Sequence, residues 1–299
     1  MQYGDAVRSV RRAIAAERAE PLLNPLGVTR LLDHGRRTER SIVLFHGFTN
    51  CPQQFVQLGE MLYDRGYNVL IPRIPRHGMR DRLTDALVSL SYADIETIGA
   101  MAYAWATGLG EETDAAGISL GGVIAAWLAQ TRTVHTALVI SPFFSLPIVP
   151  TLVSDLLAQV MVLGPSLFLW WDPRLRERTL PNYAYPRYPT RALGQCILLG
   201  QSARTLAKTT SPSAERIVVI LNEKEPATNN AAARSLEERW RAYGAPLETE
   251  VWDDVGRRHD VIDPTTFPQA PELVYPRLIA LLNAARNVRP TPLTSAAER

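Results

Sequence analysis

A serine flanked by glycines is the residue of this sequence best suited to covalent chemistry. Ser119 lies in Gly117-Ile118-Ser119-Leu120-Gly121, directly before an apolar segment that begins at Gly122. The glycines predict a sharp turn from a strand into a helix, because side chains there would collide with the neighbouring backbone. Such a turn lifts the hydroxyl toward the free N–H groups of the helix, which favour developing negative charge. We therefore predict that Ser119 is a nucleophile; a glycine-rich turn without a chemical role would also explain the glycines.

A nucleophilic serine needs a base, and in a parallel sheet that base lies on a loop at the carboxyl ends of the strands. The sequence contains five histidines, at His34, His46, His77, His135 and His259. His259 follows the last predicted strand, in the polar loop DDVGRRHDVIDP, and is the preferred base. His135 enters its strand at the amino end, so we expect it at the opposite edge of the sheet. His34 and His77 are expected to be structural, and a solvated loop histidine is the alternative interpretation of His259.

The orienting carboxylate is expected on the loop after the predicted strand RIVVIL at residues 216–221. This loop reads Asn222-Glu223-Lys224-Glu225-Pro226 and offers two carboxylates. Glu225 is preferred, because a carboxylate past the end of the strand can turn back toward His259. Glu223 is the alternative acid, and a solvated acidic loop without a role is also compatible with the sequence. Three weaker candidates share a loop with the histidine: Asp253, Asp254 and Asp260.

Short apolar segments alternate with helical patterns along most of the chain, which predicts an α/β fold with a mostly parallel central sheet and helices on both faces. The strands are expected at residues 67–71, 113–118, 135–140, 216–221 and 248–252, and the helices at 52–64, 92–107, 120–128, 228–243 and 271–286. The first two apolar runs, residues 28–33 and 41–45, are expected to form a hairpin that feeds the sheet. Function is then expected at the carboxyl ends of the strands.

Residues 142–211 interrupt this alternation. The segment is rich in proline and contains an apolar tract, residues 156–171, that is broken at Gly164-Pro165. The tract is short for a membrane helix, so we predict a mostly helical cap (lid) insertion over the functional edge, with a buried helix pair as the alternative. We expect four parts in the chain: an N-terminal amphipathic helix at 1–20, a core at 21–141 and 212–287, the cap at 142–211 and a flexible tail at 288–299.

Composition excludes several classes of partner. The 299 residues are 46% hydrophobic and carry a formal net charge of +2 with scattered charges, so no nucleic-acid-binding surface is expected. Cys51 and Cys196 are too few for a disulfide framework and lack metal-ligand neighbours at useful spacing. The N-terminus lacks the apolar core of a signal peptide, which favours a cytoplasmic protein. We expect a small-molecule substrate, no integral membrane span and no cofactor or metal, and exposed faces of the N-terminal helix and the cap could support a homodimer.

In these features the chain resembles the α/β-hydrolase-fold serine hydrolases, and among them the carboxylesterase and monoacylglycerol-lipase-like branch. The motifs that carry the resemblance are spread over the chain outside the N-terminal helix and the tail: His46-Gly47-Phe48, Arg76-His77-Gly78, GISLGG, NEKEPATN and RRHDVIDP. The resemblance implies that Ser119 is the nucleophile, His259 the base and Glu225 the acid of a catalytic triad. It also implies an oxyanion hole made by the backbone N–H groups of Leu120 and Phe48.

Two residues depart from the pattern of that family. Most members carry Asp where this chain has Glu225, and many carry Gly where it has Arg258, which puts a positive charge near the site. The resemblance implies hydrolysis of a carboxylic ester through an acyl-enzyme on Ser119. The aromatic residues of the cap favour a small to medium apolar acyl or aryl ester. Thioesterase, lipase and other acyl or C–C bond hydrolase activities would use the same triad, and a non-catalytic ligand-binding homologue is the alternative of a different class.

Overall fold

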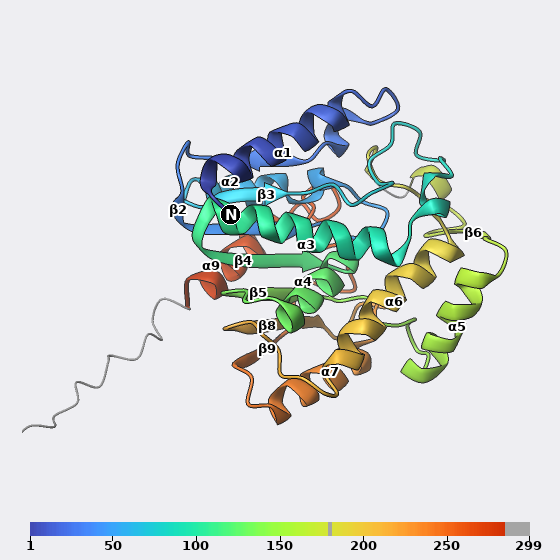
Figure 1. The fold of residues 1–299 in the computed structure, drawn as a ribbon. Coiled ribbons are helices and arrows are strands. Elements are labelled where there is room, and N and C mark those ends of the chain that lie inside the picture. The colour runs from blue at the N-terminus through green and yellow to red at the C-terminus, as the bar shows by residue number, and fades with distance from the viewer. Residues whose placement is uncertain (179–180, 285–299) are drawn as a thin grey trace, which may run out of the picture.

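A sheet forms the centre of the computed structural model, which describes residues 1–178 and 181–284 (Figure 1). The predicted tail at 288–299 lies outside the described residues, as do the last three residues of the predicted core. Within the described ranges, seven strands form the sheet in the order β1-β3-β2-β4-β5-β8-β9. The strands are β1 Arg30–Leu32, β2 Thr38–Phe45, β3 Asn68–Ile71, β4 Gly110–Ile118, β5 Ala137–Ile140, β8 Ile217–Asn222 and β9 Leu247–Trp252, and a separate ribbon consists of β6 Phe168–Trp170 and β7 Arg187–Pro189.

The sheet is parallel except at one edge, where β1 runs antiparallel to β3. The predicted hairpin between residues 28–33 and 41–45 is therefore wrong: β1 pairs with β3, with Leu31 opposite Leu70. β2 lies between β3 and β4 instead. Its residues 42–45 are fully buried, and an apolar strand covered on both faces belongs inside a parallel sheet rather than beside a short edge strand.

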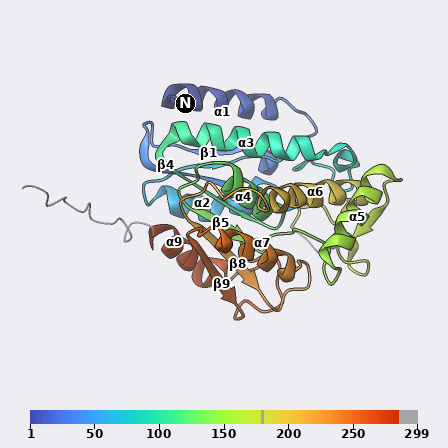
Figure 2. The same ribbon diagram turned by 60° about the horizontal axis from the view of Figure 1, so that its bottom comes forward.

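Helices cover both faces because side chains alternate along each strand. Val43 and Phe45 of β2 pack in one cluster with α1, α3, α4, α6 and α7, whereas Ile42 and Leu44 pack in another with α2, α8 and α9. Figure 2 shows α1 packed on α3, on the side of α3 that faces away from the sheet. The helices are α1 Tyr3–Arg18, α2 Val56–Tyr63, α3 Tyr92–Leu109, α4 Leu120–Thr131, α5 Thr151–Leu163, α6 Thr190–Leu206, α7 Asn230–Ala242, α8 Ala270–Leu273 and α9 Tyr275–Ala284.

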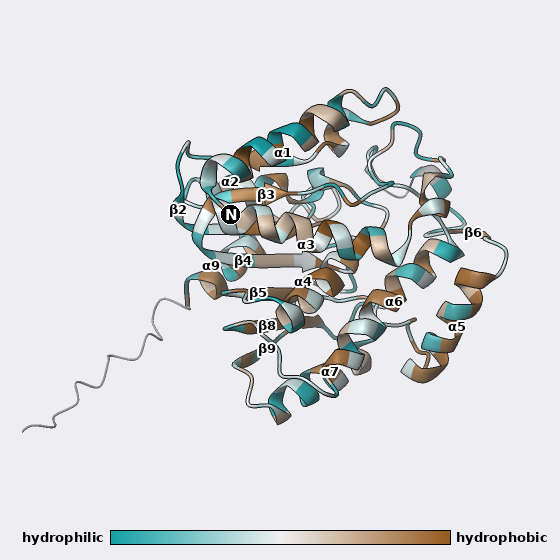
Figure 3. Ribbon diagram, in the orientation of Figure 1, coloured by the Kyte–Doolittle hydropathy of each residue, from teal (hydrophilic) through white to brown (hydrophobic). Residues whose placement is uncertain are grey.

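The segment 142–211 contains α5, the β6–β7 ribbon and α6. The inner helix, α6, packs against α4 and α3, whereas α5 packs against α6 and lies at the periphery (Figure 1). α5 contains several strongly hydrophobic residues, drawn brown in Figure 3 between teal ones, and many of them are exposed. Four of its side chains are 62% to 82% exposed: Leu152, Leu156, Val160 and Leu163. No described helix combines the length and the apolar character needed to cross a bilayer.

Candidate active site

The turn between β4 and α4 holds Ser119 in a conformation that is rare for a residue with a side chain. Its φ is 58° and its ψ is −116°, and such backbone strain costs about 1–3 kcal/mol. The flanking glycines make the turn possible. A Cβ on Gly121 would lie 1.9 Å from the carbonyl oxygen of Phe45, and one on Gly117 would lie 2.2 Å from the carbonyl oxygen of Gly121. The strand-to-helix turn predicted from the sequence is present, and it places Ser119 at the carboxyl end of β4.

Two backbone N–H groups beside this turn are available as donors. Leu120 is the first residue of α4, where N–H groups have no partner within the helix. Phe48 lies in the loop that follows β2, and it lines the same cavity as Ser119. Among the described residues, neither the Leu120 N–H nor the Phe48 N–H has a backbone acceptor. These are the two N–H groups that the family resemblance names as oxyanion donors, a role that stays a prediction.

The peptide group between Gly47 and Phe48 is held in one orientation. Its carbonyl oxygen accepts hydrogen bonds from Nδ1 of His46 at 2.9 Å and from the N–H of Asn50 at 3.2 Å. Because Nε2 of His46 accepts the N–H of Ile74 at 3.1 Å, the proton of the neutral ring lies on Nδ1. Burial lowers the pKa of His46 well below its usual value, which keeps the ring neutral. In a trans peptide the C=O and N–H point in opposite directions, so these bonds also aim the Phe48 N–H.

His259 contacts the carboxylate of Glu225 on the loop after β8. Its Nδ1 lies 3.2 Å from Oε2, and the Glu225 side chain is fully buried. The N–H of Ala227 donates to the same oxygen at 2.8 Å, and the hydroxyl of Thr228 donates to Oε1. Burial raises the pKa of Glu225, but the hydrogen bond and charge of His259, together with the bonds from Thr228 and Ala227, outweigh burial and lower the pKa overall. The ionised carboxylate therefore fixes Nδ1 as the protonated nitrogen of the imidazole.

The other acidic candidates make no hydrogen bond or ion pair with the imidazole among the described residues. Glu223 forms an ion pair with Arg234, and its side chain is 44% exposed. Asp254 forms an ion pair with Arg277 at the surface. Asp260 lines the cavity but accepts hydrogen bonds from amide side chains of the loop after β2. Among the described residues, Glu225 is thus the acidic side chain that contacts His259.

A cavity of about 350 Å³ lies between Ser119 and His259, and both residues line it. Its apolar lining comes from the core and from the 142–211 segment: Phe48, Ile118, Trp171, Ala184 and Ala227. Arg258 also lines it. No hydrogen bond joins the Ser119 hydroxyl to the His259 imidazole, whose side-chain partner is Glu225.

The 142–211 segment reaches the cavity through Trp171. The indole N–H donates to Oγ1 of Thr49 at 2.9 Å, and the indole ring meets the ring of Phe48 edge-on. The N–H of Tyr185 donates to the carbonyl oxygen of Thr49 at 2.8 Å. Thr49 has a φ of 67°, which residues with a side chain rarely adopt. No feature of the sequence pointed to these contacts, which fasten the loop after β2 to the 142–211 segment.

The remaining histidines do not line the cavity. His135 lies before β5 and contacts the carboxylate of Glu215 at 3.0 Å. His34 stacks on the ring of Tyr63. His77 is completely buried, and burial lowers its pKa to about 4. His34 and His77 thus lie outside the cavity that Ser119 and His259 line, and His135 lies before β5, away from the carboxyl ends of the strands, as the sequence predicts.

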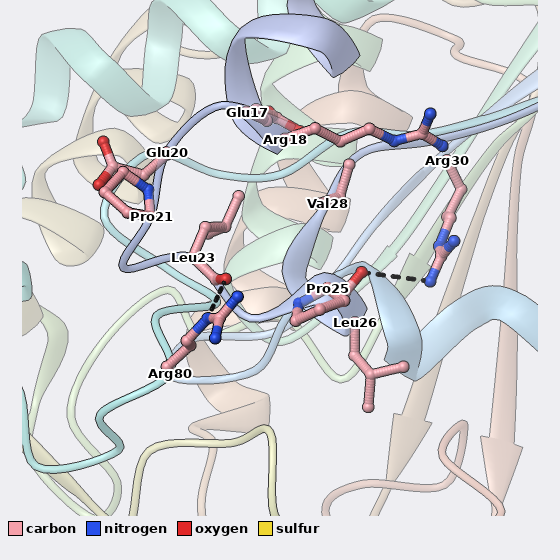
Figure 4. Close-up of a pocket in the computed structure, with 10 residues that line it drawn as sticks. All are labelled: Glu17, Arg18, Glu20, Pro21, Leu23, Pro25, Leu26, Val28, Arg30 and Arg80. Carbon is pink, nitrogen blue, oxygen red and sulfur yellow. Dashed lines mark hydrogen bonds between the residues drawn. The ribbon is translucent and has the colours of Figure 1, made fainter.

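A second cavity, of about 300 Å³, shares no lining residue with the first (Figure 4). Two of its guanidinium groups donate to backbone carbonyls: Arg80 to Leu23 and Arg30 to Pro25. None of the residues that line it is a serine, cysteine or histidine, so it offers no nucleophile comparable to Ser119. Within the described part of the chain, no group of three or more His, Cys, Asp or Glu side chains could hold a metal ion.

Known proteins share this fold. The model of the alpha/beta hydrolase family matches residues 42–278. A structure described for LipS and LipT, two metagenome-derived lipolytic enzymes, has a TM-score of 0.67 and 18% identity, covering 88% of this chain and 99% of that chain. The monoacylglycerol lipase of Paleococcus ferrophilus has a TM-score of 0.65 and 17% identity, and the match covers 86% of this chain and 98% of that chain. A soluble variant of the monoglyceride lipase of Saccharomyces cerevisiae has a TM-score of 0.60 and 14% identity, and the match covers 86% of this chain and 91% of that chain. A search of curated proteins found no match.

Proposed function

The chain belongs to the alpha/beta hydrolase family, and from this premise we propose that it is a serine hydrolase of carboxylic esters. In this proposal Ser119 is the nucleophile, His259 the general base and Glu225 the acid that orients the base. One observation carries it: Ser119 and His259 line a single cavity, and the buried carboxylate of Glu225 contacts Nδ1 of His259. The chain order of nucleophile, acid and base is the order expected on this fold.

The reaction begins when Nε2 of His259 takes the proton of the Ser119 hydroxyl as Oγ attacks the carbonyl carbon of the ester. The carbonyl oxygen gains negative charge, and the N–H groups of Leu120 and Phe48 donate hydrogen bonds to it. His259 then gives its proton to the leaving alkoxide as the C–O bond breaks, which releases an alcohol and leaves the acyl group on Ser119. Water deprotonated by His259 attacks the acyl carbon, and collapse of this second intermediate releases the acid and returns the proton to Oγ. The charge of Glu225 stabilises the imidazolium in both halves of the reaction.

The cavity favours an ester with a small to medium apolar acyl or aryl group. Its volume of about 350 Å³ lies at the lower end of the range of small-molecule sites. Phe48 and Trp171 offer aromatic surfaces to such a group. A thioester carbonyl would enter the same machinery, so the ratio of kcat/KM for an ester and a thioester with the same acyl group decides between esterase and thioesterase.

Two reagents test the proposed chemistry. A short-chain aryl ester should be hydrolysed with saturation kinetics, and an organophosphonate should stop turnover and add its mass to a peptide containing Ser119. The Ser119→Ala variant should show neither turnover nor the adduct, at an unchanged thermal midpoint. A folded wild-type protein that neither hydrolyses the ester nor takes up the label would favour a non-catalytic ligand-binding protein instead.

A lipase is the second candidate, and the exposed apolar side of α5 favours it. Leu156 on this side is 62% exposed, and an apolar surface of this kind can bind aggregated lipid. If this surface serves catalysis, hydrolysis should rise sharply when the substrate passes its aggregation threshold. Leu156→Gln should reduce the rate above the threshold and leave the rate below it unchanged, whereas Leu22→Gln, at a leucine outside the insertion that is 64% exposed, should change neither. A smooth saturation curve through the threshold would count against a lipase.

A further inference from the structure

A buried glutamine links the loop after β2 to the loop that carries His259. Gln54 lies in the short 3₁₀-helix Pro52–Phe55 and is 3% exposed. Its Oε1 accepts the N–H of Gly47 at 2.8 Å, and its Nε2 donates to Oδ2 of Asp260 at 2.8 Å. The partners dictate the orientation of the amide, since a backbone N–H only donates and a carboxylate only accepts.

Asp260 is a fixed anchor for this link. Its Oδ1 accepts the N–H groups of Ile262 and Asp263 at 3.1 and 3.0 Å, which ties the carboxylate to its own loop. Its Oδ2 also receives the side-chain amide of Asn50 at 3.3 Å. Asp260 directly follows His259 in the chain. A group that binds the Asp260 carboxylate is therefore fixed in position relative to the loop that carries the imidazole.

At its other end, Gln54 holds the residue that precedes the Phe48 N–H. Both polar backbone groups of Gly47 are fixed: the N–H by Gln54 and the C=O by His46. We propose that Gln54 is a positioning residue that keeps the Phe48 N–H aligned with His259, so that the oxyanion donor and the base face the same reacting carbonyl. This inference rests on the proposed function, because the alignment matters only if an oxyanion forms in the cavity.

The chemistry of the side chain supplies a sharp test. Gln54→Glu keeps the size of the side chain but replaces the donor with a second carboxylate oxygen facing Asp260, so that attraction becomes repulsion between like charges. Adding Asp260→Asn restores one donor and one acceptor with reversed polarity, because the amide at position 260 can donate to the carboxylate at position 54. The longer bond of 3.3 Å from the Asn50 amide to the same atom of residue 260 is lost in this variant. Gln54 lines the cavity, so a carboxylate at position 54 also puts charge there. Gln53→Glu controls for the same charge one residue away at a side chain that does not line the cavity, and the double variant controls for the carboxylate at position 54 itself.

Two measurements distinguish positioning from general stability. With a short-chain aryl ester, Gln54→Glu should lower kcat about ten- to a hundredfold and leave KM within about threefold, part of the loss of about 100- to 1000-fold that follows removal of an oxyanion donor. The Gln54→Glu/Asp260→Asn double variant should recover most of that loss. Hydrogen–deuterium exchange over residues 46–50 should be faster in Gln54→Glu, restored in the double variant and unchanged in Gln53→Glu.

Unchanged exchange over residues 46–50 in Gln54→Glu would overturn the proposal whatever the activity. Faster exchange with an unchanged kcat would overturn it too, as would an equal loss of kcat in Gln53→Glu. If the wild type shows neither turnover nor a phosphonate adduct on Ser119, the proposed function fails and takes the oxyanion role of Gln54 with it. The exchange measurement would then still decide whether Gln54 holds the loop.

Discussion

Replacing Glu225 with glutamine separates the effect of its charge from its effect on the imidazole tautomer. Oε2 of Glu225 contacts Nδ1 of His259 and accepts the N–H of Ala227, while Oε1 accepts the hydroxyl of Thr228. A glutamine oxygen in the place of Oε2 would keep the first two bonds. Its amide nitrogen would donate to the Thr228 hydroxyl, which can rotate to accept. The variant Glu225→Gln therefore keeps the productive tautomer and loses only the negative charge beside the imidazolium.

The expected loss follows from that geometry. The Nδ1 to Oε2 distance of 3.2 Å places the charge of Glu225 close enough to stabilise the imidazolium strongly. An opposite charge at such a distance is worth about one to three pKa units, so kcat should fall about 10- to 1000-fold in Glu225→Gln. Glu225→Ala removes the acceptor for Nδ1 as well and should lose about 10,000-fold or more, the size of the loss when the acid of a serine triad is removed.

Steady-state hydrolysis of a short-chain aryl ester measures both losses, with active enzyme counted by organophosphonate labelling and folding checked by the thermal midpoint. Glu223→Gln is the matched control, because Glu223 pairs with Arg234 at the surface and should leave activity near wild type. An active Glu225→Gln together with an inactive Glu223→Gln would refute the choice of acid. Equal losses in Glu225→Gln and Glu225→Ala would refute the tautomer argument.

Three further predictions concern the nucleophile and base, the turn at Ser119, and the stability of the fold at low pH. Ser119→Ala and His259→Ala should each lower kcat for the same ester by about three orders of magnitude or more. If either variant kept about a tenth of the wild-type kcat, the role proposed for that residue would be wrong. Gly121→Ala should lower the thermal midpoint of unfolding steeply, because the new Cβ would lie 1.9 Å from a backbone oxygen of β2. Gly47→Ala is the control and should lower the midpoint far less, since its Cβ would lie 3.5 Å from the nearest non-adjacent atom. Equal midpoints in the two variants would contradict this argument. The pKa of Glu225 is lowered from its ordinary value of 4.5, so this carboxylate stabilises the fold above that value and its contribution is lost as the pH falls through the lower folded-state pKa. The free energies of unfolding of wild type and Glu225→Gln should therefore converge in acid, and a gap that stays constant down to about pH 3 would argue against it.

The alternation of apolar segments predicted the parallel sheet and most of its helices. It failed at the first strand, because β1 is only three residues long and pairs with residues of β3 that come later in the chain. The separation is 41 residues from Arg30 to Ile71 and 37 residues from Leu32 to Val69. Two apolar runs joined by a short polar connection can form a hairpin, or can be separated in the sheet by a third strand. The sequence of the connection does not distinguish these two arrangements. The unbroken apolar run at residues 42–45 is the sequence feature that fits a central strand, since the structure buries it on both faces.

The candidate site was predictable where strand ends fix a position and unpredictable where loop conformation decides. Ser119 and His259 follow strands of one parallel sheet, so their loops meet at one edge. Spacing alone could not choose between Glu223 and Glu225, which lie on the same loop. The choice depends on the turn after Glu225, in which the Ala227 N–H and the Thr228 hydroxyl bind its carboxylate.

The loop after β2 is contacted by parts of the chain that are distant in sequence. Its Gly47 N–H is bound by Gln54, which is itself anchored on the loop of His259, and its Thr49 is bound by Trp171 from the 142–211 segment. Thr49 has a positive φ, which residues with a side chain rarely adopt. Its bond to Trp171 spans 122 positions of sequence and joins the 142–211 segment to the residue that directly follows the proposed oxyanion donor, Phe48. A substitution of Trp171 is therefore expected to act on the same loop as a substitution of Gln54.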